Sequence, residues 1–146
     1  MKVEVKIDNT ITEPKIIILT DKMTDEINEV VRKISETEPD IIAGFINETV
    51  RILDQKDIYR IYAEAGHVYA ETESGVYMLR QRLYEIEERM RRFSFVRISN
   101  SEIINLKKVK MFDLCFSGTI CVSLTNKTVT YVSRRYVSKI KEVLCI

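Results

Sequence analysis

Residues 95–109 read FVRISNSEIINLKKV, and this stretch indicates the fold more clearly than any other part of the chain. Its first residues are mostly aromatic or β-branched, which favours a strand. The Ser and Asn residues that follow are typical of a loop, and Asn100 lies within it. Asn105 stands in an apolar run, so we expect its amide to satisfy buried backbone groups. The stretch therefore predicts a strand, then a polar loop, then a basic pair, Lys107 and Lys108.

Short segments with strand composition lie on both sides of this stretch. We expect strands at residues 41–45, 49–53, 58–64, 68–73, 76–79, 109–116, 119–124 and 128–132. Turns are expected at Ala65-Gly66, Ser74-Gly75, Ser117-Gly118 and Asn126-Lys127. Two helices are expected, at residues 82–91 and 135–143, with apolar faces formed by Leu83, Ile86 and Met90, and by Val137, Ile140 and Val143 or Leu144. This order predicts mainly antiparallel β structure with helices, an α+β fold.

Residues 1–40 have a different pattern of apolar and charged residues, which predicts a short βαβ-like extension. Alternating charged and apolar residues predict a strand at residues 3–7, and Pro14 separates it from an apolar strand at residues 16–19. Apolar residues at helical spacing then predict a helix at residues 21–35. Its first half is acidic and its end is basic, as the helix dipole favours.

The length of 146 residues predicts one domain with a small extension. Residues 36–40 contain a proline and predict the linker, which leaves the domain at residues 41–146. A hydrophobic content of 45% with 31% charged residues is ordinary for a globular protein and excludes a disordered or collagen-like chain.

The chain lacks the sequence motifs that are typical of zinc-binding proteins, of several enzyme classes, and of secreted or membrane proteins. The three cysteines, Cys115, Cys121 and Cys145, form no CxxC pair, so we expect reduced thiols, no zinc site and no other metal or cofactor. One His and the lack of GxSxG, P-loop and HExxH motifs predict no catalytic residues and no enzyme activity. The charged N-terminus and the short apolar runs predict neither a signal peptide nor a membrane span, and we expect a cytoplasmic protein.

A net charge of +1 conceals two opposed regions. Residues 1–88 carry 11 Lys and Arg against 19 Asp and Glu, a net of −8, whereas residues 89–146 carry 12 against 3, a net of +9. A basic region of this density attracts a phosphate backbone. The separation of charge is equally expected if the acidic and basic regions form surfaces or subunit faces that neutralise each other. Charge alone therefore leaves both interpretations open.

Three ordered motifs resemble those of the LytTR family of bacterial DNA-binding domains. Residues 95–109 resemble its signature, an aromatic-led strand followed by a Ser, an Ile-Asn step and a basic pair. Residues 131–140, YVSRRYVSKI, resemble the closing motif, in which Ser and Arg lead into the final helix. Residues 57–64, DIYRIYAE, resemble the early strand.

The chain departs from the family pattern in two places. Ser99 stands where many members have His, and Glu102 stands where an aromatic residue is common. Glu102 also introduces a carboxylate into the basic segment. Residues 1–40 are too few for a receiver domain, so the resemblance implies a short, stand-alone member.

The resemblance implies an elongated arrangement of small antiparallel sheets, in which loops rather than a recognition helix enter successive major grooves. Three positions carry over as base contacts: His67, Asn100 and Arg135. An Arg guanidinium can donate two hydrogen bonds to guanine, and an Asn amide can pair with adenine. Six further residues suit phosphate contacts, which fix register without reading sequence: Arg97, Ser101, Lys107, Lys108, Lys110 and Arg134.

Each of these residues also has an ordinary structural interpretation. His67 can be an exposed loop residue, and Asn100 can stabilise its own turn. Arg134 and Arg135 can be plain helix-start residues. Two cations at a helix N-terminus oppose the helix dipole, however, which favours an external anion at that position.

We therefore expect a sequence-specific DNA-binding transcriptional regulator that reads repeated half-sites about 10 bp apart, as a dimer or as two copies. The alternative is a non-catalytic protein-interaction or oligomerisation module whose basic face binds an acidic partner. Residues 1–40 are expected to supply a dimerisation element. The expected partners are double-stranded DNA and a second copy, with no small-molecule substrate. Since stand-alone members are often encoded beside a small membrane protein, the resemblance also suggests a regulatory membrane-protein antagonist.

Overall fold

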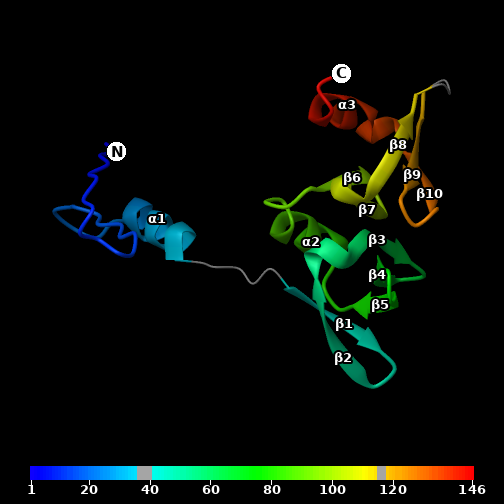
Figure 1. The fold of residues 1–146 in the computed structure, drawn as a ribbon, viewed down its shortest axis with the longest axis horizontal. Helices are drawn as coiled ribbons and strands as arrows, with labels where there is room; N and C mark the ends of the chain where they lie inside the picture. Colours follow the sequence, from blue (N-terminus) through cyan, green and yellow to red (C-terminus); the bar gives the residue numbers. More distant parts are fainter. Residues whose placement is uncertain (36–40, 115–117) are drawn as a thin grey trace. The chain divides into compact units, whose positions relative to one another are not determined.

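The computed structural model describes residues 1–35, 41–114 and 118–146. Three predicted features lie wholly or partly outside the described residues: the linker at residues 36–40, residues 115–116 at the end of a predicted strand, with Cys115, and Ser117 of one predicted turn. The chain forms two compact units, Met1–Thr37 and Glu38–Ile146, which we describe separately (Figure 1).

The first unit contains one helix, α1 (Asp25–Ser35), which confirms the helix predicted in this region. The helix starts at Asp25 because Thr24 caps it: the Thr24 hydroxyl accepts a hydrogen bond from the backbone N–H of Ile27 at 3.3 Å. The sequence predicted a start four residues earlier, at Asp21, but residues 21–24 precede the helix, and the acidic residues Asp25 and Glu26 form its first turn.

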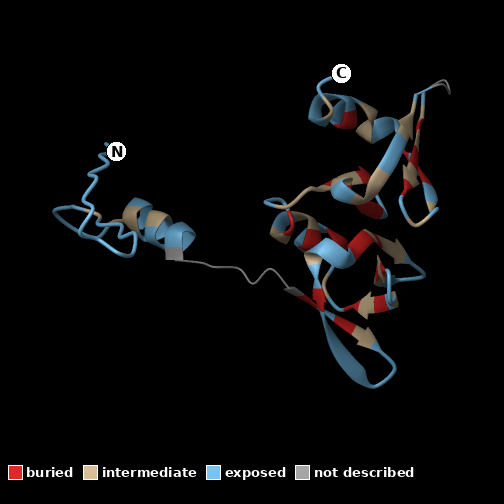
Figure 2. Ribbon diagram, viewed as in Figure 1, coloured by how far each residue is buried: buried red, intermediate tan, exposed pale blue. Residues whose placement is uncertain are grey.

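The two strands predicted in this unit, at residues 3–7 and 16–19, do not form, and the βαβ-like extension is wrong in that respect. An alternating pattern makes a strand only where a neighbouring strand pairs with its backbone N–H and C=O groups. No such neighbour exists among residues 1–35, and their apolar side chains stay largely exposed (Figure 2).

The second unit is built on a seven-stranded antiparallel sheet in the order β2-β1-β5-β4-β3-β7-β6. Its strands are β1 (Ile41–Ile46), β2 (Thr49–Asp54), β3 (Ile58–Glu64), β4 (His67–Thr72), β5 (Gly75–Leu79), β6 (Phe95–Ser99) and β7 (Glu102–Asn105). Helix α2 (Leu83–Arg89) packs against the sheet, and its predicted apolar face is buried beside Ile58, Ile61 and Ile103.

A three-stranded sheet follows, in the order β10-β9-β8, with strands β8 (Val109–Asp113), β9 (Ile120–Leu124) and β10 (Val129–Val132). Helix α3 (Arg134–Val143) closes the unit and buries Ile140 completely. A second core joins Ile140 to β6, β7 and this smaller sheet through Ile98, Ile104, Val122 and Val132. The predicted α+β class, mainly antiparallel β with helices, is confirmed.

Strand β7 is the one strand of the described part of this unit that the sequence did not predict. All four of its residues are buried, although Glu102 and Asn105 at its ends are polar. Asn105 behaves as predicted: its side-chain amide donates to the carbonyl of Ile58 at 2.9 Å. Its oxygen also accepts from the N–H of Lys107 at 3.1 Å and so caps the short 3-10 helix η2 (Leu106–Lys108). A second 3-10 turn, η1 (Gln55–Asp57), precedes β3.

Candidate nucleic-acid interface

The turn between β3 and β4 presents His67. Ala65 and Gly66 form this turn with positive φ angles of 50° and 80°, and His67 is the first residue of β4. The His67 side chain is exposed, and its ring lies edge-on to Tyr69 with the ring centroids 6.4 Å apart. The imidazole therefore stands at the end of a hairpin and faces solvent.

The turn between β6 and β7 carries Asn100 and Ser101, and Arg97 holds it closed. The Arg97 guanidinium donates to the backbone carbonyls of Ser99 at 2.7 Å and Asn100 at 2.5 Å. The Ser99 hydroxyl accepts from the N–H of Ser101 at 3.2 Å, and the two hydroxyls lie 3.3 Å apart. The turn is thus fixed internally while the side chains of Asn100 and Ser101 remain exposed.

The N-terminus of α3 lies directly beside this turn. The backbone N–H of Ser133, just before the helix, donates to the carbonyl of Ile98 at 2.9 Å. The Tyr136 hydroxyl donates to Oδ1 of Asn100 at 3.2 Å. Arg134 and Arg135 are both exposed at the first two positions of the helix. The start of α3, which carries the arginine pair, therefore lies beside the turn that carries Asn100.

The two turns are also neighbours. The backbone N–H of Ala63, near the end of β3, donates to the carbonyl of Ser101 at 2.8 Å. On its other side Ala63 pairs with Val68, the residue after His67. The segments that carry His67, Asn100 and Arg135 therefore follow one another along a single edge of the unit.

The predicted phosphate contacts divide into separate groups. Arg134 and Ser101 lie at the edge just described. Lys107 is exposed in η2 and Lys110 is exposed on β8, both beyond the opposite end of β7 from the Asn100 turn. Lys108 is half-buried, and its Nζ lies 5.1 Å from the centroid of the Tyr59 ring.

Arg97 occupies a different position from the other predicted phosphate contacts. Its side chain is only 12% exposed and forms an ion pair with Glu87 of α2, with Nη1 and Oε2 2.6 Å apart. All three guanidinium nitrogens therefore have partners within the protein. The predicted phosphate contact of Arg97 stays a prediction, and the structure adds an internal role for this residue.

A sequence model of the LytTR DNA-binding domain matches residues 48–145, which include both turns and α3. The chain belongs to the LytTR family. The predicted family is therefore confirmed. Curated relatives described as uncharacterized HTH-type transcriptional regulators of Staphylococcus aureus, among them those of strains NCTC 8325 and COL, are 31% identical over 147 residues. These alignments cover 100% of this chain and 99% of each relative, so they include the N-terminal unit.

The fold has a counterpart among solved structures. The LytTR DNA-binding domain of a Bacillus cereus protein described as a methyl-accepting/DNA response regulator superposes with a TM-score of 0.72 at 19% identity. The match covers 75% of this chain and 100% of the other. It shows that the second unit has the LytTR fold.

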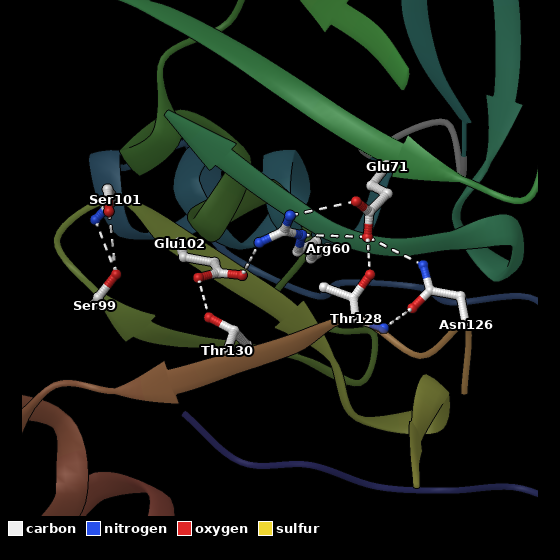
Figure 3. Close-up of polar contacts among 8 residues, drawn as sticks. All are labelled: Arg60, Glu71, Ser99, Ser101, Glu102, Asn126, Thr128 and Thr130. Carbon is white, nitrogen blue, oxygen red and sulfur yellow. Dashed lines mark hydrogen bonds and ion pairs between the residues drawn. The ribbon is translucent and has the colours of Figure 1, made fainter. Parts of the chain in front are cut away.

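Glu102, which departs from the family pattern, is buried rather than displayed on the basic segment. Its carboxylate is 11% exposed and accepts from Arg60 of β3 at 2.9 Å and from the Thr130 hydroxyl of β10 at 2.6 Å (Figure 3). Thr130 belongs to the smaller sheet, whereas Arg60 belongs to the larger one. Glu102 therefore ties the two sheets together and adds no exposed negative charge to the interface.

Glu71 makes a second connection of the same kind (Figure 3). It accepts from Arg60 at 3.2 and 3.3 Å, and from the side chains of Asn126 and Thr128 at the β9–β10 turn, both at 3.1 Å. Burial by itself raises the pKa of the Glu71 carboxyl, but the hydrogen bonds from Asn126, Arg60 and Thr128 outweigh it and hold the pKa below its ordinary value. The carboxylate form of Glu71 is therefore part of what holds the two sheets together.

Two residues of this candidate interface were not found from the sequence, Glu87 and Tyr136. Glu87 stands among several charged residues of its helix, and nothing in the sequence distinguishes it from Glu88. Tyr136 follows Arg135 directly, and a Tyr beside the predicted base reader was the available signal. Both act through contacts that only the packing of α2 and α3 on the β6–β7 hairpin creates.

The described part of the chain holds no group of three or more His, Cys, Asp and Glu residues placed to bind a metal ion. Of the cysteines it covers, Cys121 is half-buried and Cys145 is exposed, and both are free thiols. None of its helices is long and apolar enough to span a membrane.

Proposed function

We propose that the protein is a sequence-specific DNA-binding transcriptional regulator whose loops read half-sites in the major groove. The observation that carries this proposal is the chain of contacts from Ala63 to Ser101 and from Asn100 to Tyr136, which gathers three predicted base readers at one edge. Family membership and the names of the relatives support the regulator assignment.

The chemistry of the three side chains suits this role. Arg135 can donate to guanine O6 and N7, and Asn100 can pair with adenine N6 and N7. His67 at its exposed turn can donate or accept a hydrogen bond. The exposed residues Ser101, Lys107, Lys110 and Arg134 suit phosphates, which set register and supply the salt-dependent part of the affinity.

A mobility-shift titration at several salt concentrations tests the proposal. The probes are a duplex selected by the wild-type protein from a random pool and a shuffled duplex of the same composition. We expect tighter binding to the selected duplex, and an affinity for both that falls as salt rises, because phosphate contacts release counterions. A salt slope near zero contradicts DNA binding, and equal affinities contradict sequence reading.

The competing proposal, a basic face that binds an acidic protein partner, is favoured only by the segregation of charge into −8 and +9 regions. It predicts oligomers that dissociate as salt is raised, without DNA binding. Size-exclusion chromatography at low and high salt, alongside the titration, distinguishes the two proposals.

We also propose that two copies pair through the first unit. Its helix has acidic residues in the first turn and basic residues in the last turn. Two α1 helices packed antiparallel would set opposite charges against each other. The unit also exposes large apolar side chains that a partner would cover: Ile16, Ile17, Leu19, Met23, Val31 and Ile34.

A further inference from the structure

The ion pairs of Glu87 join three elements, β6, α2 and α3. Arg97 belongs to β6, its ion-pair partner Glu87 belongs to α2, and Lys139 of α3 lies 4.0 Å from the same Glu87 carboxylate. The Arg97 side chain is 12% exposed and that of Glu87 31%. The ion pair is therefore partly shielded from water. Removing either residue would leave the charge of the other without its partner and only partly hydrated.

The hydrogen bonds of Arg97 determine the path of the β6–β7 turn. The guanidinium uses Nε for the carbonyl of Ser99, Nη2 for the carbonyl of Asn100 and Nη1 for Glu87. A guanidinium is a rigid planar fork, so two carbonyls bound to it are held at a fixed separation. Glu87 in turn fixes the fork against α2, which is anchored in the core through Ile86.

The side chain of Asn100 is oriented by a separate contact. The Tyr136 hydroxyl donates to Oδ1 of Asn100 at 3.2 Å, so the amide oxygen faces α3. An Asn that is free to rotate offers DNA either its donor or its acceptor. One whose oxygen accepts from a neighbour has its amide plane fixed, and the NH₂ group and the second lone pair of the oxygen stay available to a base in one orientation, which favours discrimination between bases.

We propose that Arg97 and Glu87 are positioning residues and that Tyr136 is a specificity-determining residue for Asn100. The Arg97–Glu87 pair presents the turn to DNA, and Tyr136 sets the face of the amide that meets the base. This inference rests on the proposed function, since it assigns how one of the base readers is held. It differs from the expectation that Arg97 binds a phosphate.

The two roles for Arg97 predict opposite effects of one substitution. If Arg97 binds a phosphate, Glu87→Gln frees it and removes a negative charge, so affinity rises for any DNA. If Arg97 positions the turn, Glu87→Gln loosens the turn and lowers affinity for the selected duplex only. Glu85→Gln, at an exposed position of the same helix, is the matched control for the change in charge.

The experiment measures the ratio of affinities for the selected and shuffled duplexes, and the salt slope, for wild type, Glu87→Gln, Arg97→Lys and Tyr136→Phe. We expect this affinity ratio to fall roughly tenfold in each variant, which is the effect of losing one good base contact, and we expect the salt slope to stay unchanged. Glu85→Gln and the exposed Tyr84→Phe should keep the full ratio. Thermal unfolding of each variant confirms that it is folded, and Tyr136→Phe, which removes only a hydroxyl, keeps the test valid if the charge variants unfold.

Any of three results would overturn this inference without affecting the proposed function. The affinity ratio could equal the wild-type ratio in all variants, or Glu87→Gln could bind both duplexes more tightly. The third result is a salt slope that Arg97→Lys reduces by about 1. A wild-type protein that binds both duplexes equally overturns the proposed function, and this inference with it. The two failures are therefore separate observations.

Discussion

Arg135 and Lys107 are both exposed and basic, but their surroundings suit different contacts. Arg135 lies one residue from Tyr136 and so beside the turn that carries Asn100. Lys107 lies in η2, beyond the far end of β7. A side chain that reads a base changes discrimination between sequences, whereas one that binds a phosphate changes affinity for all of them.

We expect Arg135→Ala to reduce the preference for the selected duplex by about 1–3 kcal/mol, because one bidentate base contact is lost. Lys107→Ala should weaken binding to both duplexes about equally and reduce the salt slope by about 1. Lys107 is a cleaner test than Lys108, whose ammonium also packs on the Tyr59 ring. Fluorescence anisotropy with both duplexes measures the two effects. An unchanged base preference in Arg135→Ala would remove that residue from the set of base readers.

Glu71 predicts how stability depends on pH. Its pKa is held below the ordinary value in the folded protein, so its contribution is present in full above the unfolded-state pKa, about 4.3. That contribution is lost as the pH falls through the lower, folded pKa. The wild-type protein should therefore lose stability below about pH 4.3 more steeply than Glu71→Gln.

Urea unfolding between pH 7 and pH 3 measures this difference. Glu85→Gln, which alters an exposed carboxylate, is the control and should follow the wild-type curve. Parallel curves for wild type and Glu71→Gln would mean that Glu71 does not stabilise the folded state in its charged form.

At the scale of elements, the sequence predicted the strands of the second unit because their apolar residues alternate or cluster in ways typical of strands. Strand β7 was missed because Glu102 makes it look polar. The Glu102 carboxylate can be buried because it accepts hydrogen bonds from Arg60, 42 residues earlier, and from Thr130, 28 residues later. Partners so distant in sequence are not visible in a local pattern.

Near the N-terminus the error is the opposite one, because two strands were predicted that do not form. Residues 3–7 alternate as strand residues do, but within residues 1–35 no other strand pairs with them. A local pattern can propose a strand, and only a partner can stabilise it. For the candidate site, the predicted base contacts came from motif resemblance, whereas Glu87 and Tyr136 emerged only from the packing of helices on the β6–β7 hairpin.

Gly44 of β1 provides a prediction for the larger sheet. A Cβ at this position would lie 2.7 Å from Leu53 Cδ1 and 2.8 Å from Tyr77 Cβ, so Gly44→Ala should overpack the core. We expect a loss of about 1–3 kcal/mol in the free energy of unfolding. Ala43→Ser, at the exposed neighbouring position, should have little effect. Urea denaturation measures both, and a Gly44→Ala variant as stable as wild type would show that this contact can relax freely.

At the scale of the whole molecule, the near-neutral charge is the sum of an acidic N-terminal region and a basic C-terminal one. The buried position of Glu102 leaves the basic region with fewer exposed carboxylates than its sequence suggests. The second unit forms a compact unit of its own and has the fold of a solved LytTR domain, so we expect it to fold without the first.

A chain that starts at Glu38 should therefore fold and bind DNA but lose self-association. Light scattering after size-exclusion chromatography should give a dimer for the full chain and a monomer for the shortened one. Replacing both Arg32 and Lys33 by Glu in the full chain should also weaken pairing, since the antiparallel α1 contact would then set like charges together. A shortened chain that remains dimeric would assign dimerisation to the second unit instead.

The central claim is that loops at one edge of the second unit read bases in the major groove. Methylation interference on the selected duplex tests it most directly, because a methyl group on guanine N7 blocks the atom that an Arg contacts there. We expect methylated guanines to be depleted from the bound fraction in two clusters about 10 bp apart, on one face of the duplex. Identical methylation patterns in bound and free DNA would contradict it.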